Sequence, residues 1–260
     1  TRCSRDWSSD VCSSDLTYYS NDKTYGGTWY YNRETPQAWA NVLGKEMVLV
    51  VAAGNSALPY VSNPATFASA TDSTGKLILN GQMIIAGNWN STSNTITGQT
   101  AGHVCKVMLN NVCKDTYRTS DFYLLAPGVA INSTYLNSTY REMSGSSMSA
   151  PAISGAVAVV HQLWPYMKGD QIVQVLLKTA NKNLPNYNPA IHGQGMLDMD
   201  RATQPVGSVS IPISGRTTSS VNSSTLNLSG GNGSAFSSLK NTGILSSVMI
   251  VDDFFRDFYV

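Results

Sequence analysis

The sequence lacks a charge imbalance and long apolar runs, and each absence argues against a class of function. Lysine and arginine together number 17 and the acidic residues 16, which gives a formal net charge of +1. This balance offers no electrostatic attraction to nucleic acid or to an anionic membrane. No apolar run reaches the roughly 20 residues that a membrane-spanning helix needs. The composition, rich in Ser, Thr, Asn and Gly and poor in Lys, instead resembles that of secreted proteins.

Cysteine is scarce, and two of the four cysteines lie in a stretch that does not read as protein. The letters DWSSDVCSSDL, residues 6–16, match the translation of a widely used sequencing-library adapter. We therefore expect residues 1–16 to be an artefact and the native part to begin near Thr17, cut by a read end. Cys105 and Cys113 remain. A local disulfide between them and two free thiols both fit the sequence, whereas a metal pair would need further ligands that are not grouped nearby.

The hydrophobic pattern predicts an α/β fold with a parallel sheet flanked by helices. The run MVLVVAAGNS has the continuous apolar character of a buried strand in such a sheet. A hairpin-type turn is expected at Asn80-Gly81, and Asp170 is a plausible helix N-cap. The expected helices are 35–47, 146–165 and 169–182, and the expected strands lie within 47–56, 75–90 (two short strands) and 120–134, the last broken at Pro127-Gly128.

After about Gln204 the sequence becomes rich in Ser, Gly and Thr, with alternating apolar residues. We expect a partial catalytic-type domain over 17–204. Residues 205–260 are expected to begin a β-type extension that continues beyond the end of the chain.

The segment GSSMSAP, residues 145–151, places serines between small residues at the start of an apolar helix. A helix N-terminus leaves backbone N–H groups unpaired, and its dipole favours negative charge nearby. These features suit a nucleophilic serine. They equally suit a serine that only caps the helix, so the segment alone does not decide between the two.

GSSMSAP resembles the nucleophile motif of the subtilisin-like serine proteases, the S8 family. Three other segments are similar to motifs of that family and follow its order along the chain, over residues 47–202: VVAAGNS, LLAPGVAINST and GQGMLDMDRA. The chain departs from the family pattern at Ser146, where threonine is usual, at Ser149, where alanine is usual, and at Ile153, near a position where histidine is frequent.

The resemblance implies a role for each site residue. Ser147 would be the nucleophile, and the side-chain amide of Asn55 would complete an oxyanion hole with the Ser147 N–H. The backbone of Ala52, Ala53 and Gly54 would form the wall of a substrate pocket, and Gly145 would leave room for the substrate. The implied reaction is hydrolysis of a protein or peptide substrate. It requires no cofactor and no catalytic metal, while a structural calcium site remains open.

A serine nucleophile needs a base, and the chain has three histidines. In the resembled family the order along the chain is Asp, His, Ser, but no histidine precedes Asn55. His103 and His192 lie in other motif contexts, and His161 follows Ser147 along the same helix by about 20 Å at 1.5 Å per residue. We therefore expect that the Asp and His lie upstream of a truncation and that this fragment is inactive alone.

Two alternatives to a protease remain to be weighed. A catalytically dead module of the same fold, used for adhesion at a surface, differs only in the upstream Asp and His. An α/β-hydrolase elbow needs Gly-x-Ser-x-Gly, and Ser149 occupies its last position. The latter reading is therefore excluded by the sequence.

The end of the chain, MIVDDFFRDFYV, resembles a segment of the autotransporter-type subtilases of Gram-negative bacteria. That resemblance implies export through the periplasm to the cell surface and an outer-membrane translocator barrel as partner. A plain secreted subtilase is the alternative.

Overall fold

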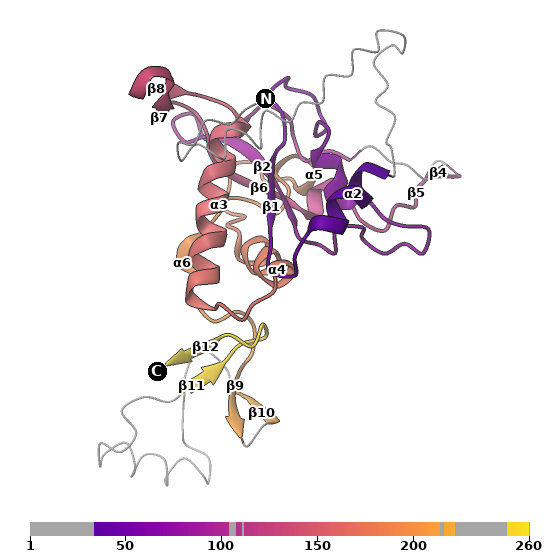
Figure 1. Ribbon diagram of the computed structural model, residues 1–260, viewed down its shortest axis with the longest axis vertical. Coiled ribbons are helices and arrows are strands. Elements are labelled where there is room, and N and C mark those ends of the chain that lie inside the picture. The colour runs from indigo at the N-terminus through magenta and orange to yellow at the C-terminus, as the bar shows by residue number, and fades with distance from the viewer. Residues whose placement is uncertain (1–33, 104–107, 111, 214–215, 222–248, 260) are drawn as a thin grey trace. The chain divides into compact units, whose positions relative to one another are not determined.

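The computed structural model describes residues 34–103, 108–110, 112–213, 216–221 and 249–259 (Figure 1). The chain divides into two compact units, one up to Met199 and one from Asp200 onward. This division lies near the boundary that the change in composition suggested. Within the described ranges, no helix combines the length and apolar character needed to cross a membrane.

The first unit is built on a sheet whose central strand is β2 (Met83–Asn90). Strand β2 pairs in parallel with β1 (Leu49–Ala52) and β6 (Tyr123–Pro127), and antiparallel with β3 (Thr95–Thr97). Its side chains are buried along nearly its whole length, as expected for a parallel strand covered on both faces. The predicted parallel sheet is confirmed.

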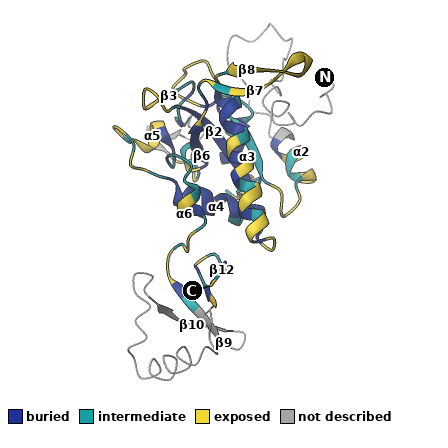
Figure 2. Ribbon diagram, turned by 90° about the vertical axis from the view of Figure 1, so that its left-hand side faces the viewer, coloured by how far each residue is buried: buried dark blue, intermediate teal, exposed yellow. Residues whose placement is uncertain are grey.

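Helix α3 (Ser146–Leu163) runs along this sheet in contact with β1, β2 and β6 (Figure 1). Its buried face carries Ile153, Ala156 and Val160, and an exposed stripe follows its other side (Figure 2). Helix α4 (Gly169–Thr179) buries an apolar face of Ile172, Val173 and Leu176. The α/β class is therefore confirmed. The remaining helices are α2 (Glu34–Val42), α5 (Pro189–His192) and α6 (Met199–Ala202), with 3-10 turns η1 (Ala65–Ser69), η2 (Thr119–Asp121) and η3 (Leu136–Ser138).

The turn predicted at Asn80-Gly81 forms, with φ of +51° and +77° and the Gln82 N–H donating to Leu79 O at 2.9 Å, but the hairpin expected around it is wrong. Leu77 forms only an isolated bridge with Thr71, and its neighbour Leu79 is buried in a turn. The turn then leads into β2, which pairs in parallel with β1 rather than folding back on residues 75–80. An Asn-Gly turn specifies a hairpin only when both flanking strands can pair. Here the apolar residues of β2 are buried between two parallel neighbours instead.

The N-cap predicted at Asp170 is also wrong. The residue before α4 is Lys168, in extended conformation, and its N–H donates to Gln171 Oε1 at 2.9 Å. Asp170 lies in the first turn, where a carboxylate is favoured by the helix dipole without acting as the cap.

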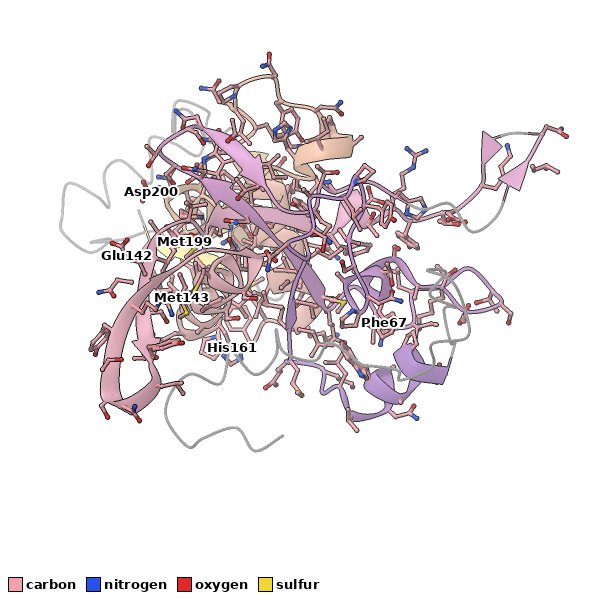
Figure 3. All side chains as sticks on the ribbon, turned by 90° about the horizontal axis from the view of Figure 1, so that it is seen from above. Phe67, Glu142, Met143, His161, Met199 and Asp200 are labelled. Atoms are coloured by element: carbon pink, nitrogen blue, oxygen red, sulfur yellow. The ribbon has the colours of Figure 1, made fainter. Side chains whose placement is uncertain are left out.

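Two hairpins extend from the first unit. One joins β4 (Met108–Leu109) to β5 (Val112–Cys113) and projects from the body in two views (Figures 1 and 3). Cys105 and the side chain of Cys113 lie outside the described residues, so the disulfide stays a prediction. The other joins β7 (Ile131–Tyr135) to β8 (Thr139–Met143) and leads directly into α3. Glu142 and Met143 mark its end in Figure 3.

The second unit contains an antiparallel sheet in the order β10–β9–β11–β12. Its strands are β9 (Val209–Ile213), β10 (Arg216–Val221), β11 (Met249–Val251) and β12 (Asp257–Tyr259). The Ser/Gly-rich residues 222–248 lie outside the described residues.

Candidate active site

Two segments far apart in sequence meet where β1 ends and α3 begins. The N–H of Ser146 donates to Asn55 Oδ1 at 2.8 Å, and the Ser146 hydroxyl lies 3.0 Å from the same oxygen. The N–H of Gly54 donates to the Ser146 hydroxyl at 3.1 Å. Ser146 is fully buried. The asparagine-bearing loop and the start of α3 are therefore joined by a local hydrogen-bond network.

This network determines which atoms of the asparagine amide are left for a ligand. Because Oδ1 accepts from Ser146, the NH₂ group of Asn55 takes no part in this contact. No described residue accepts a hydrogen bond from the NH₂ group. Asn55 is exposed and Ser147 is half-buried. The N–H of Ser147, in the first turn of α3, likewise has no acceptor among the described residues. Two donors near the Ser147 hydroxyl thus remain available to an anionic oxygen.

Glycines at two positions leave space for this arrangement. A Cβ at Gly145, where φ is +150°, would lie 3.0 Å from Asn55 Nδ2 and 3.1 Å from Oδ1. A Cβ at Gly54, where φ is +111°, would lie 2.5 Å from Gln99 Nε2 and 2.6 Å from Ser62 Oγ. The sequence suggested that Gly145 leaves room for a substrate. In the structure it leaves room for the Asn55 amide.

Comparison with known proteins identifies the family of the chain. The sequence model described as the subtilase family matches residues 12–196. The chain belongs to the subtilase family. Its relatives include Subtilisin DY of Bacillus licheniformis, 26% identical over 65% of this chain and 51% of the relative. The Extracellular serine protease of Serratia marcescens is 34% identical over 40% of this chain and 10% of the relative.

This subtilase spans about half the length of several curated relatives that it matches. A further relative, the Thermostable alkaline protease of Halalkalibacterium halodurans, is 38% identical over 30% of this chain and 21% of the relative. Among solved structures, the self-cleaved protease domain of PatA is 19% identical with a TM-score of 0.44, covering 66% of this chain and 55% of that one.

The three residues expected to form a pocket wall in this subtilase differ in accessibility. Ala52 and Gly54 are half-buried, whereas Ala53 is fully buried. The Ala53 N–H donates to Ala86 O at 2.9 Å, and its carbonyl accepts from the Ser62 N–H at 2.8 Å. Ala53 therefore belongs to the sheet, and only its two neighbours retain surface for a ligand.

Two residues after Ser147, the subtilase uses a buried hydroxyl to hold α3 on the sheet. Ser149 Oγ donates to Ala126 O, near the end of β6, at 2.8 Å. The N–H of Gly145 donates to Gly128 O at 2.8 Å. These contacts fix the helix start relative to β6. Sequence reasoning noted Ser146 and Ser149 only as departures from the family pattern and missed that both make structural hydrogen bonds.

None of the three histidines of this subtilase contacts Ser147. His103 Nε2 lies 2.7 Å from Asp115 Oδ2 in a largely buried hydrogen-bonded pair. His192 accepts the Asn188 N–H at 3.0 Å. His161 lies on α3 itself, and its Nε2 is buried without a partner in the described structure. Among the described residues, no three His, Cys, Asp or Glu side chains form a group that could hold a metal ion.

Proposed function

We propose that this chain carries half of the catalytic apparatus of a serine endopeptidase. Ser147 is the nucleophile, and Asn55 with the Ser147 N–H binds the oxyanion. The observation that carries the proposal is the pair of hydrogen bonds from Ser146 to Asn55 Oδ1. They orient the asparagine amide so that its NH₂ group, which has no acceptor among the described residues, lies beside the start of α3. A serine that only caps the helix would not require an asparagine from the loop after β1 in this orientation.

In the proposed mechanism, Ser147 Oγ attacks the carbonyl carbon of the scissile peptide bond. A histidine base takes the hydroxyl proton, and the carbonyl oxygen becomes an anion held by Asn55 Nδ2–H and the Ser147 N–H. The tetrahedral intermediate collapses, the C–N bond breaks, and the amine leaves with the proton from the histidine. Water then hydrolyses the acyl-enzyme by the reverse sequence of proton transfers.

The histidine base must be a residue other than the chain's three histidines, because none of these contacts Ser147. We propose that an Asp and a His are supplied by a longer parent protein. The chain by itself is then inactive or nearly so, since a serine hydroxyl without a base is a poor nucleophile. The competing proposal, a catalytically dead module of the same fold, predicts that the parent lacks one of these two residues.

A fluorophosphonate probe tests the proposal directly. The longer parent should be labelled once, and mass spectrometry of its peptides should place the label on Ser147. The isolated 260-residue chain should react far more slowly, because its serine lacks an activating base. Stoichiometric labelling at another serine would overturn the assignment. An unlabelled parent with no upstream Asp and His would favour the dead module.

Removing the proposed oxyanion donor has a characteristic kinetic effect. In the active parent, Asn55→Leu should lower kcat by roughly 10²–10³ with little change in KM, since the lost hydrogen bond forms mainly in the transition state. Steady-state kinetics on a peptide substrate measures both constants. The exposed Asn183 offers a matched control, and Asn183→Leu should leave both unchanged. An Asn55→Leu enzyme with wild-type kcat would remove Asn55 from the mechanism.

For location, we propose secretion or display at the surface of a Gram-negative bacterium, with export through the periplasm and an outer-membrane translocator barrel in the parent. The support is the resemblance of residues 249–260 to autotransporter-type subtilases and the similarity to the Extracellular serine protease of Serratia marcescens. A secreted subtilase without a barrel is the alternative. The sequence downstream of Val260 in the parent gene distinguishes the two.

A further inference from the structure

A buried glutamine lies behind the loop that carries Asn55. Gln99 follows β3 and is 1% exposed. Its backbone N–H donates to Gly54 O at 3.2 Å, and its side-chain Oε1 accepts the Ser56 N–H at 2.8 Å. One residue thus binds the chain immediately before and immediately after Asn55.

These two hydrogen bonds restrict both backbone dihedrals of Asn55. The Gly54 carbonyl belongs to the peptide group on the φ side of Asn55, and the Ser56 N–H belongs to the peptide group on its ψ side. With both peptide planes held, the direction of the Asn55 Cα–Cβ bond is set by the backbone. The hydrogen bonds from Ser146 then fix only the rotation of the amide.

Gln99 is itself held by the core. Its Nε2 donates to Ser62 Oγ at 2.7 Å, and its backbone carbonyl accepts from Tyr123 Oη at 2.7 Å. Tyr123 lies fully buried at the start of β6, and burial raises the pKa of its hydroxyl well above the ordinary value. The hydroxyl therefore stays protonated and donates throughout the working pH range of a protease.

The preceding residue permits the close approach of the two loops. A Cβ at Gly98, where φ is +85°, would lie 2.7 Å from Gly54 O and 3.5 Å from Asn55 Cα. Any larger residue would push Gln99 away from the asparagine loop. The Gly98-Gln99 pair, the buried Tyr123 hydroxyl and Ser62 form a continuous support from the sheet to Asn55.

We propose that Gln99 is a positioning residue for the oxyanion hole, acting through the backbone on either side of Asn55. The inference rests on the proposed function, because it assigns Gln99 a role in the same transition state. Gln99 does not touch the reacting atoms. Its contribution is to hold the Asn55 amide at the place where the negative oxygen forms, and small displacements of such a donor reduce catalysis strongly.

The test is a double-mutant cycle in the active parent. Methionine matches glutamine in length but offers neither donor nor acceptor amide, so Gln99→Met should lower kcat by about 10- to 100-fold with KM changed less than about threefold. In an Asn55→Leu background, Gln99→Met should cause no further loss. This non-additivity separates positioning of Asn55 from general damage to the fold.

Gln82 provides the matched control. It is 5% exposed and its Nε2 donates to Gly44 O at 2.7 Å and Met47 O at 2.8 Å, away from the Asn55 loop. Gln82→Met removes a similarly bonded buried amide and should leave kcat per titrated active site within about twofold of wild type. A kcat loss as large as that of Gln99→Met would show that any buried amide loss impairs this enzyme, and would overturn the inference.

The remaining outcomes are equally decisive. If Gln99→Met lowers kcat by the same factor with and without Asn55, the inference fails while the proposed function stands. If Asn55→Leu alone has no effect, the proposed function fails and the inference with it. A changed preference for the residue before the scissile bond, at unchanged kcat, would make Gln99 a pocket residue instead. If Gln99→Met does not fold, Ser62→Ala removes only the acceptor of Gln99 Nε2. This change should lower kcat about 2- to 10-fold, and only when Asn55 is present. An unchanged kcat would overturn the inference.

Discussion

Replacing Ser147 with alanine should lower kcat of the active parent by about 10⁶-fold, the scale of loss when a subtilisin-type nucleophile is removed. The Ser147 hydroxyl oxygen forms the acyl bond. Among the described residues, no other hydroxyl without a hydrogen-bond partner lies beside the Asn55 amide. The Ser146 hydroxyl is fully buried and bonded to Gly54 and Asn55. Residual activity of roughly 10³–10⁴ over the uncatalysed reaction should persist, because the oxyanion hole and substrate binding remain intact.

The adjacent serine gives the sharpest control for this experiment. Ser146→Ala removes a hydroxyl one residue away but leaves the backbone N–H that donates to Asn55 Oδ1 at 2.8 Å. The lost hydroxyl accepts the Gly54 N–H and donates to Asn55 Oδ1. Two neutral hydrogen bonds are worth about 1–3 kcal/mol together, so kcat should fall about 100-fold or less. Burst-phase acylation and kcat/KM on one peptide substrate measure both variants. If Ser146→Ala were the more damaging change, the nucleophile assignment would be wrong.

The elements that carry the site were predictable because their sequences satisfy several physical requirements at once. The run that leads to Gly54-Asn55 is continuously apolar, which favours a strand of a parallel sheet, although only Val51 of β1 is buried among the described residues. The segment from Ser146 to Leu163 combines small residues with helical apolar spacing, although its proline, Pro151, lies inside the helix and not in the first turn. Both became β1 and α3 with bounds close to those expected.

The features that sequence reasoning missed depend on contacts between distant segments. No local sequence pattern marks Gln99 as a residue that binds both sides of Asn55. Its hydrogen-bond partners Ser56, after β1, and Tyr123, in β6, lie far from it in the chain. The hairpin expected at Asn80-Gly81 failed for the same reason. A local turn signal is weak compared with the apolar surface that β2 buries between two parallel neighbours. Tertiary partners are not visible in a local pattern.

In the second unit, the largest effect on stability is expected from Arg256. Its side chain is 0% exposed, an unusual state for a residue that is always charged. Arg256 Nε and one terminal nitrogen donate to Asp252 Oδ2 at 3.0 and 2.7 Å, and the two terminal nitrogens reach the carbonyls of Ala202 and Gln204. The guanidinium thus connects the start of this unit to its last strands.

The Arg256→Met change should destabilise the second unit by about 3–5 kcal/mol, because it leaves the Asp252 carboxylate buried without its counter-charge. A unit of about 60 residues has an unfolding free energy of roughly 3–9 kcal/mol, so the loss is comparable to its whole stability. Hydrogen exchange of the amides of residues 249–259 in the full chain measures the effect. Gln204→Met, at an exposed side chain whose backbone carbonyl is retained, should change exchange by no more than about 0.5 kcal/mol.

A paired substitution separates lost charge compensation from lost packing. Asp252 Oδ1 also accepts the backbone N–H groups of Phe254 and residue 256, at 2.9 and 3.0 Å, and Oδ2 accepts that of Val206 at 3.0 Å. An asparagine oxygen in the Oδ1 position preserves the first two bonds without a charge and loses the third. Asp252→Asn combined with Arg256→Met should therefore be more stable than Arg256→Met alone, because no unpaired charge is buried. The guanidinium carbon of Arg256 lies 6.0 and 5.3 Å from the ring centroids of Phe254 and Phe258. If the double variant were instead less stable, the main role of Arg256 would be its packing against these rings and its hydrogen bonds to two backbone carbonyls.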